Sequence, residues 1–355
     1  MEFIDEDAVA KRDWDTNPDG TVRVAVVGLG GYALEVSLPA IAASDYCEVG
    51  AVVSGSPEVR AETAAEHDAV ALDYEAYDDG VGADEYDAVY LATPNRRHLD
   101  GATTAADHSK AVLSEKPVEA TPERAAAVVD RCADAGVTLM TAYRMQTDPV
   151  IRRLREWIAA GLVGDPIKAF GDFTFPVLAG DRGPEQWRLD DHLAGGGALF
   201  DVGVYPLNTA RYLLDADPVA VSGTTRSTEP AFDEVDEHVD FRVEFPAAVG
   251  SFSASFSGQA DTRLSVLGTA GRVEVVDAFE PDRDRRVRIE RGDDVVEFAG
   301  LGADETVEEF DYFAHCVLTG ERPEPDGRDG LVDCRTMAAV YESARRDERV
   351  EVDGP

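Results

Sequence analysis

The first part of the chain alternates short apolar runs with longer amphipathic stretches. Val22–Val27 (VRVAVV) has the continuous apolar pattern of a buried strand, and a helix-like stretch separates most such runs from the next. We expect the further strands at residues 48–54, 86–94, 111–117 and 137–144. Strands that alternate with helices predict an α/β Rossmann fold, a parallel, doubly wound sheet whose ligands bind at the carboxyl ends of the strands.

The pattern changes at about Pro166, where apolar and polar residues begin to alternate one by one. Such period-two segments recur and predict largely antiparallel strands. Two helix-like segments, residues 306–320 and 330–346, close the chain. At this length we expect two domains, a Rossmann domain at residues 1–145 and an α+β domain with a large, mostly antiparallel sheet at residues 146–355. The last helices are candidates to pack back on the first domain.

The chain is strongly acidic: 71 Asp and Glu residues against 33 Lys and Arg give a formal net charge of −38. Nucleic acid and anionic membranes are polyanions, so this charge argues against both as partners. The acids are scattered through turns and helix faces rather than collected in one tail. At about 1 M salt the Debye length is only about 3 Å, which screens their mutual repulsion. We therefore expect a halophilic source; an acidic mesophilic enzyme is the alternative.

The apolar runs and the cysteines predict a soluble cytoplasmic protein. No apolar run reaches the roughly 20 residues of a membrane helix, and the N-terminus, MEFIDEDAVAKRDWD, lacks the basic-then-apolar pattern of a signal peptide. The four cysteines show neither a CxxC pair nor the spacing of a metal site, which fits a reduced cytoplasmic chain. We expect no bound metal.

A glycine fingerprint follows the first strand directly. In GLGGYA, Gly28, Gly30 and Ala33 match the G-x-G-x-x-G/A pattern of a turn that seats the pyrophosphate of a dinucleotide. Gly28 permits the tight turn, Gly30 lets the backbone approach the phosphates, and Ala33 allows the helix to pack closely on the strand. With the intervening Gly31 and Tyr32, these residues form the expected cofactor loop.

The end of the second strand favours NADP over NAD. NAD-preferring folds place an acid there to bind the ribose 2′-hydroxyl. This chain instead has Ser54 and Ser56, with Arg60 one turn into the next helix. Hydroxyl groups and a guanidinium suit a phosphate monoester. The alternative is that Arg60 is a solvated helix residue paired with Glu62 or Glu66, which leaves NAD open.

The loop ATPNRRH follows a later strand, on the side where the nicotinamide is expected. We expect four of its residues to line the cofactor: Thr93, Pro94, Asn95 and His98. For His98 the alternative is a residue at the N-terminus of a helix that takes no part in chemistry.

Five segments occur in the order and rough spacing of one known family: GLGGYA, ATPNRRH, SEKPVEA, TAYR and GGGALFDVGVYPLN. From about residue 22 to 346 the chain resembles the glucose–fructose oxidoreductase, inositol dehydrogenase and rhizopine-catabolism family. The glycine fingerprint is generic, whereas EKP followed roughly 85 residues later by D-x-G-x-Y-x-x-N is specific. Within the family the chain is most similar to the sugar dehydrogenases, notably glucose–fructose oxidoreductase and the NADP-dependent D-xylose 1-dehydrogenases of halophilic archaea.

The resemblance implies that Lys116 of EKP lies in the active site and that a cis peptide bond precedes Pro117. The chain has only four lysines, so a lysine retained here suggests a need that arginine does not meet. The pKa of an ammonium falls readily on burial or beside other cations, so it can exchange protons near neutral pH, whereas a guanidinium stays protonated. We expect Lys116 to act in catalysis and to contact substrate and cofactor, and Glu115 to contact the cofactor.

Asp201, Tyr205 and Asn208 are spaced four and three residues apart, so they share one face of the expected helix. A carboxylate, a phenol and an amide on one face can hold adjacent sugar hydroxyls, so we expect all three residues to bind substrate and Asp201 to act in catalysis with Tyr205. The resemblance implies that Tyr205 is the acid/base, at or near a position where inositol dehydrogenase-like members carry histidine. Lys116 close by would lower the pKa of the phenol, so the two would work as a unit. The alternatives are a capping or turn role for Asp201 and a core position for Tyr205.

Arg144, Trp187 and Arg188 complete the expected cofactor site. Arg144 ends TAYR at the close of the sixth strand, and the other two stand shortly before the glycine loop of residues 195–197. The resemblance implies that such residues reach the cofactor or the sugar. A loop tryptophan is as often a packing residue, so that alternative stays open.

Together these features predict an NADP-dependent dehydrogenase that oxidises the anomeric carbon of an aldose, D-xylose or D-glucose, to the lactone. One alternative within the family is oxidation of a polyol such as inositol, or of a trans-dihydrodiol. Another, of a different class, is a non-catalytic sensor of NAD(P) or sugar; the intact Lys116 and Tyr205 argue against it. The resemblance also implies a homo-oligomer, a dimer or tetramer, that pairs through the C-terminal sheet.

Overall fold

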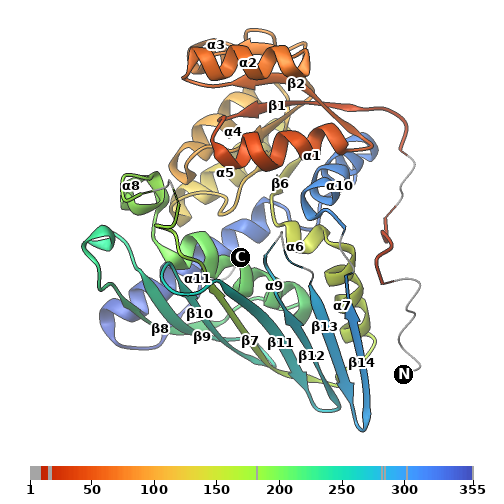
Figure 1. Ribbon diagram of the computed structural model, residues 1–355, viewed down its shortest axis with the longest axis vertical. Helices are drawn as coiled ribbons and strands as arrows, with labels where there is room; N and C mark the ends of the chain where they lie inside the picture. Colours follow the sequence, from red (N-terminus) through yellow and green to blue (C-terminus); the bar gives the residue numbers. More distant parts are fainter. Residues whose placement is uncertain are drawn as a thin grey trace. The chain divides into compact units, whose positions relative to one another are not determined.

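The computed structural model describes residues 9–14, 18–180, 183–280, 283, 285–300 and 303–353. The chain divides into two compact units, which we describe separately (Figure 1). The first, called here the Rossmann unit, comprises Trp14–Thr147 and Asp304–Leu331. The second, called the C-terminal unit, contains Asp148–Ala303, the end of the chain from Val332 and a short N-terminal segment.

Six parallel strands form the described sheet of the Rossmann unit, in the order β3-β2-β1-β4-β5-β6 that dinucleotide-binding folds share. The expected parallel sheet is confirmed. The three-residue β3 was not among the expected strands, because so short a segment carries no readable period. The strands are β1 (Val22–Val27), β2 (Cys47–Val53), β3 (Val70–Leu72), β4 (Ala88–Leu91), β5 (Ala111–Ser114) and β6 (Leu139–Thr141).

Some helices of this unit begin and end at caps that are readable in the sequence. In α5 (Pro122–Ala135) the side chain of Thr121 accepts a hydrogen bond from the backbone of Arg124, and Gly136, with φ +67°, ends the helix. The helix after β1 widens into the π-helical turn η2 (Ala33–Ser37), a feature often found at functional sites. The remaining helical segments are α1 (Leu38–Ala43), α2 (Pro57–His67), α3 (Tyr74–Asp78), η3 (Asn95–Arg97), α4 (His98–Asp107), α6 (Arg144–Thr147) and α10 (Glu305–Thr319).

Helix α10 comes from late in the chain and packs into the core of the Rossmann unit. Phe310 and Phe313 are fully buried with Val24 of β1 and Tyr90 of β4. The rings of Phe310 and Tyr90 meet edge to face, with 5.1 Å between their centroids. One face of α10 is therefore fixed against the end of the strands that carry the expected cofactor loops.

The C-terminal unit is built on a nine-stranded sheet in the order β14-β13-β12-β11-β7-β10-β9-β8-β15. Of its described strand pairs, β7 and β10 run parallel and the others antiparallel, so the expected large, mostly antiparallel sheet is confirmed. The strands are β7 (Pro166–Thr174), β8 (Ala220–Arg226), β9 (His238–Glu244), β10 (Val249–Ser255), β11 (Asp261–Gly268), β12 (Gly271–Val276), β13 (Arg286–Arg291), β14 (Asp294–Ala299) and β15 (Val350–Glu351).

One face of this sheet is covered by η5 (Leu199–Gly203) and α9 (Val204–Leu214), which pack on β7 and β10. A Cβ on Gly171 of β7 would lie 2.7 Å from Cβ of Pro206, so a glycine is needed where α9 crosses the strand. The other helical segments of the unit are α7 (Pro149–Ala159), η4 (Trp187–Leu189), α8 (Asp191–Ala194), η6 (Pro230–Phe232) and α11 (Gly327–Arg346), whose first turn belongs to the Rossmann unit.

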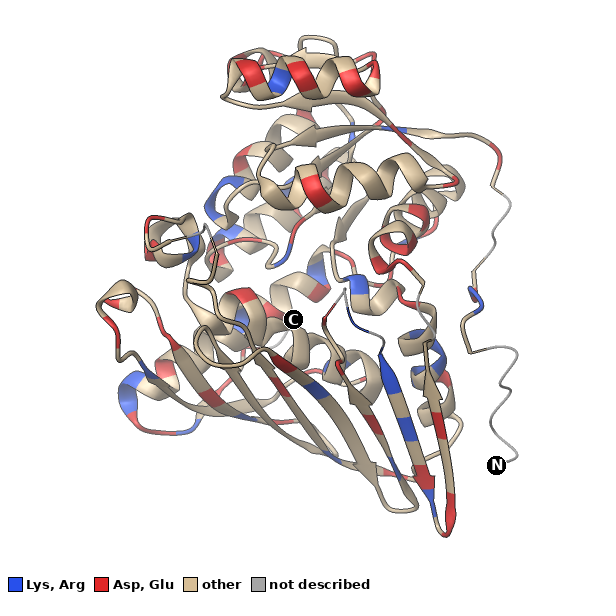
Figure 2. Ribbon diagram, viewed as in Figure 1, with Lys and Arg blue, Asp and Glu red and all other residues tan. Residues whose placement is uncertain are grey.

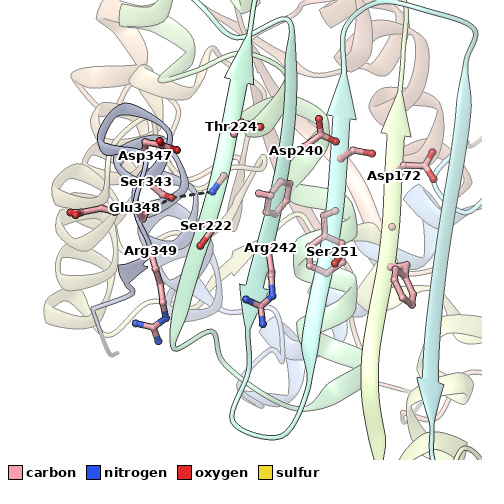
Figure 3. A pocket seen from close by; sticks show the side chains of 16 residues that line it. Asp172, Ser222, Thr224, Asp240, Arg242, Ser251, Ser343, Asp347, Glu348 and Arg349 are labelled. Carbon is pink, nitrogen blue, oxygen red and sulfur yellow. Dashed lines mark hydrogen bonds between the residues drawn. The ribbon is translucent and has the colours of Figure 1, made fainter.

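The opposite face of the sheet is open and mostly polar. Figure 3 shows a groove that runs across β7–β10 and is bordered by the end of α11. Its labelled polar side chains are Asp172, Ser222, Thr224, Asp240, Arg242, Ser251, Ser343, Asp347, Glu348 and Arg349. These side chains alternate along each strand with buried residues that face the helices, which is the period-two pattern read from the sequence.

Candidate active site

The glycine turn of the Rossmann unit leaves room for a pyrophosphate. Gly28 has φ +97°, and a Cβ there would lie 2.7 Å from the carbonyl oxygen of Ala92. Around Gly30, no described neighbour lies within 4 Å of the position that a Cβ would take. Gly31 and Tyr32 form the first helical turn, and Tyr32 is exposed. The open backbone at a helix N-terminus fits the phosphates of a bound dinucleotide.

Ser54, Ser56 and Arg60 come together at the end of β2. The Oγ of Ser54 accepts a hydrogen bond of 3.2 Å from the backbone of Ser56, whose own hydroxyl caps α2. Arg60 donates from Nη1 to the carbonyl oxygen of Ser54 at 2.6 Å, which draws its guanidinium back toward the strand end. Its ion-pair contact is with Asp73, at 4.0 Å, rather than with an acid of its own helix. A guanidinium and two hydroxyls thus lie where a ribose 2′-phosphate is expected.

The loop after β4 is tied to the segment that follows Lys116. His98 begins α4 and is fully buried; its Nε2 lies 2.9 Å from the carbonyl oxygen of Thr93, and its Nδ1 lies 3.2 Å from that of Pro117. Burial lowers the pKa of His98, although hydrogen bonds to these carbonyls oppose the shift. His98 therefore supports the loop from within. Asn95 is buried beside it, and Oγ1 of Thr93 makes no hydrogen bond within the described chain.

Glu115 and Lys116 follow β5 directly. A buried hydrogen-bond chain reaches Glu115 from η2: Ser37 Oγ lies 2.9 Å from the hydroxyl of Tyr90, which donates to Oε1 of Glu115 at 2.7 Å. The backbone of Lys116 donates to the other oxygen, Oε2, at 3.2 Å. Burial raises the pKa of Tyr90 well above its ordinary value, so it remains a phenol that can donate. The Lys116–Pro117 bond is cis, as the resemblance implies.

Arg144 lies beyond the strand on which the sequence placed it. Strand β6 ends at Thr141, and Arg144 begins the short helix α6. Its guanidinium is buried and forms an ion pair with Glu305 of α10. Glu309, one helical turn further along α10, is also buried. The sequence analysis missed both acids, although two carboxylates four residues apart in an apolar helix are a readable signal.

In the C-terminal unit, Asp201 and Arg188 form an ion pair. Asp201 lies in the π-helical turn η5, and its Oδ2 is 3.3 Å from Nε of Arg188. The guanidinium of Arg188 also lies over the ring of Trp187, at 4.7 Å from its centroid. Three residues that the sequence analysis assigned to catalysis or to the cofactor are thus brought together within one unit.

Tyr205 and Asn208 lie in α9, directly after that turn. The ring of Tyr205 is half-buried between Phe173 and Phe279, with centroids 5.3 and 5.7 Å away. Asn208 is buried, and its Nδ2 donates to Asp333 of α11 at 2.8 Å. The aromatic contacts fix the Tyr205 ring, and the Asn208 amide is used to hold α9 against α11.

The glycine loop before η5 is held by Asp236, which the sequence analysis also missed. Its carboxylate accepts hydrogen bonds from the backbone of Gly197 at 2.8 Å and of Leu199 at 3.0 Å, and from the hydroxyl of Tyr341. The ring of Tyr341 stacks on Phe200, with 5.7 Å between centroids. Burial raises the pKa of Asp236, while these donors oppose the shift. Asp236 and Tyr341 together fix the turn that carries Asp201.

Within the described ranges, no group of three or more His, Cys, Asp or Glu side chains is placed to hold a metal ion. Nor does any helix there have the length and apolar character needed to cross a membrane. Cys47, Cys132, Cys316 and Cys334 are buried free thiols. Burial raises the pKa of Cys47 to about 12 and that of Cys132 to about 11, so both stay protonated.

Known proteins match this chain in both its Rossmann part and its C-terminal part. Residues 22–143 match the oxidoreductase family with an NAD-binding Rossmann fold, and residues 151–274 match the GFO/IDH/MocA C-terminal domain. The chain is 45% identical to D-xylose 1-dehydrogenase [NADP(+)] of Haloarcula marismortui, over 97% of each chain. It is 33% identical to D-xylose 1-dehydrogenase (NADP(+)) 2 of Haloferax volcanii, over 92% of this chain and 99% of the other. A solved aldose–aldose oxidoreductase from Caulobacter crescentus superposes with a TM-score of 0.87 at 31% identity, covering 93% of this chain and 99% of that one. The chain therefore belongs to the GFO/IDH/MocA family of oxidoreductases.

Proposed function

We propose that this protein is an NADP-dependent aldose 1-dehydrogenase that oxidises D-xylose, or less readily D-glucose, to the lactone. The observation that carries the proposal is the 45% identity, over nearly the full length of both chains, to a D-xylose 1-dehydrogenase that uses NADP. A second relative of the same activity and the aldose–aldose oxidoreductase fold support the same substrate class. In this assignment residues 1–145 bind the cofactor and residues 146–355 bind the sugar.

The residues of the Rossmann unit fit NADP. The open backbone at Gly30 takes the pyrophosphate, and Arg60 with Ser54 and Ser56 takes the 2′-phosphate. The unpartnered Oγ1 of Thr93 suits a polar ligand at the loop after β4. Arg60 held at the strand end by its bond to Ser54 needs little reorganisation to bind a phosphate, which favours NADP over NAD.

Lys116 and Tyr205 handle the proton in this proposal. When bound, NADP⁺ would supply the acceptor for the hydride of the anomeric carbon, and the Tyr205–Lys116 pair would take the proton of the anomeric hydroxyl, which leaves the lactone. Asp201, oriented by Arg188, holds a neighbouring sugar hydroxyl. The carboxylate of Glu115 balances the ammonium of Lys116, and its bond to the Lys116 backbone fixes where that side chain starts.

Initial rates of NADPH formation test the reaction. In about 2 M KCl, where surface repulsion is screened, we expect D-xylose to give the highest kcat/KM among xylose, glucose, arabinose and inositol. We expect kcat/KM to be about tenfold or more higher with NADP than with NAD, because the Arg60 guanidinium gains a charge-assisted hydrogen bond only with the 2′-phosphate. Turnover of inositol alone would instead favour a polyol dehydrogenase, and no turnover by folded protein would favour a sensor.

The cofactor preference has its own control. Arg60→Ala should lower kcat/KM with NADP by about tenfold and leave kcat/KM with NAD nearly unchanged, because NAD offers no 2′-phosphate. Arg131→Ala removes an arginine whose ion pair with Asp107 lies at the protein surface and should change neither value. Equal losses with both cofactors would contradict a 2′-phosphate role for Arg60.

We further propose a cytoplasmic homo-oligomer, a dimer or tetramer, that pairs through the open face of the C-terminal sheet. Phe170 of the central strand β7 is 43% exposed in the groove of Figure 3, an unusual place for an aromatic ring on a monomer. The free cysteines suit a reducing compartment. Light scattering in high salt should give a multiple of the 38.2 kDa chain mass, and Phe170→Glu should reduce it. A wild-type monomer at that salt would refute the pairing.

A further inference from the structure

Helix α10 carries an acid whose burial nothing described so far explains. Glu305 pairs with Arg144, and Asp311 accepts hydrogen bonds from Ser44 Oγ and from the backbone of Asp45. Glu309 is only 2% exposed, yet its Oε1 finds no hydrogen-bond partner among the residues that the structure describes. An ionised carboxylate that is buried this deeply, with one oxygen lacking a donor, would be very costly.

Three observations locate Glu309 within the Rossmann unit. It lies four residues after Glu305, so both face Arg144, which pairs with Glu305. The next residue, Phe310, packs against the ring of Tyr90, whose hydroxyl binds Glu115. Glu309 therefore lies near both the Arg144–Glu305 pair and the Glu115–Lys116 segment, close enough to interact electrostatically with Glu115, Arg144 and Lys116.

A count of charges in this cluster leaves one carboxylate in excess. The acids are Glu115, Glu305 and Glu309, and the cations are Lys116 and Arg144. Glu115 accepts hydrogen bonds from two donors and Glu305 pairs with a guanidinium, whereas no described donor reaches Oε1 of Glu309. Burial, and next the Glu115 carboxylate, raise the pKa of Glu309 well above its ordinary value, although Arg144 and Lys116 oppose the shift.

Three further titratable groups of the described Rossmann unit bring no compensating charge to this cluster. Burial keeps Tyr90 of β4 a phenol and favours neutral imidazole at His98 of α4, as the directions of their pKa shifts indicate. The thiol of Cys47 of β2 hydrogen-bonds to the carbonyl oxygen of Phe310 at 3.4 Å, and burial raises its pKa to about 12, so it too is neutral. One carboxylate of the cluster must therefore be protonated. Glu309 is the acid whose negative charge is least stabilised.

We propose that Glu309 is an uncharged carboxylic acid in the working enzyme and acts as a positioning residue for Lys116. This role rests on the proposed function, in which Lys116 exchanges the proton of the reaction. An ionised Glu309 would hold a proton on Lys116 by Coulomb attraction, so Lys116 could not accept the proton of the substrate, whereas the neutral acid fills the site and leaves Lys116 able to release its proton. With Glu309 uncharged, the two remaining carboxylates, Glu115 and Glu305, are balanced by the two cations, Lys116 and Arg144.

Infrared spectroscopy of the whole protein tests the charge state without any substrate. We expect the carbonyl band of a protonated carboxylic acid at neutral pH, lost in Glu309→Gln and kept in the matched control Glu308→Gln on the same helix. Raising the pH should remove the band from the wild type as Glu309 ionises, a second measurement that needs no variant. A wild type without this band at neutral pH, or an equal band in Glu309→Gln, would overturn the proposal.

The pH dependence of kcat tests the functional part. We expect the ratio of kcat between Glu309→Gln and the wild type to rise by up to about tenfold from neutral to alkaline pH, because only the wild type gains the charge that holds the Lys116 proton. The same ratio for Glu308→Gln should stay flat. A ratio for Glu309→Gln that is low and constant at every pH would mean that an ionised Glu309 is needed, and would refute the role. If no sugar is turned over, the proposed function fails while the infrared result still decides the charge of Glu309.

Discussion

Lys116→Arg should lower kcat for xylose oxidation by roughly 10²–10⁴-fold while leaving the fold intact, the range expected for loss of a general acid–base group. A guanidinium keeps a positive charge beside Glu115 but stays protonated, so it cannot exchange the proton of the anomeric hydroxyl. The Glu115 carboxylate, held by Tyr90 and the Lys116 backbone, should tolerate either cation. Steady-state kinetics with NADP, beside circular dichroism of both proteins, measures the effect.

Lys168→Arg is the matched control, because Lys168 is exposed on β7 and the same exchange there should not change kcat. Lys116→Ala adds a sharper test, since a small primary amine added to the assay should restore part of the lost rate. A Lys116→Arg enzyme that keeps near-wild-type kcat would show that the position needs only a positive charge. Lys116 would then be a binding residue, and the proton would be handled elsewhere.

Features encoded locally were predicted well from the sequence. The strand VRVAVV and the turn at Gly28 and Gly30 were readable because the period, the glycines and the following helix all lie within about a dozen residues. The cluster of Ser54 and Arg60 was readable for the same reason, since six residues separate a strand end from the first turn of its helix. The strands of the C-terminal sheet likewise followed from the period-two alternation.

Residues that support the site across long sequence separations were missed. Glu309 reaches the Lys116 region from a helix nearly 200 residues away, and Asp236 holds the backbone of Gly197 together with Tyr341 of a third segment. A lone acid such as Asp236 or a lone tyrosine such as Tyr341 looks like an ordinary surface residue until the fold buries it, whereas the spacing of Glu305 and Glu309 was a signal that could have been read. The end of β6 at Thr141, before Arg144, was missed because tertiary pairing rather than local pattern ends that strand.

The distribution of surface charge leads us to expect a fold whose stability depends on salt. Figure 2 shows Asp and Glu on helices and strands of both units. On α2, Glu58, Glu62 and Glu66 are all exposed and four residues apart, which places like charges on neighbouring turns. Each such pair is destabilising by about 0.2–0.5 kcal/mol at low salt. Repeated over a chain with a net charge of −38, this repulsion is comparable with the roughly 5–15 kcal/mol by which a typical protein is stable.

We therefore expect the protein to lose most of its unfolding free energy when KCl falls from about 2 M to about 0.1 M, because the Debye length grows from a few ångströms to about 10 Å and exposes each carboxylate to its neighbours. Thermal unfolding followed by circular dichroism at both salt concentrations measures this. A variant that changes Glu58, Glu62 and Glu66 to glutamine should recover a few degrees of Tm in low salt and almost none in 2 M KCl, where the repulsion is already screened. The same Tm at both salt concentrations would mean that the acids are stabilised by their ion pairs, and the halophilic interpretation would give way to that of an acidic enzyme adapted to ordinary salt.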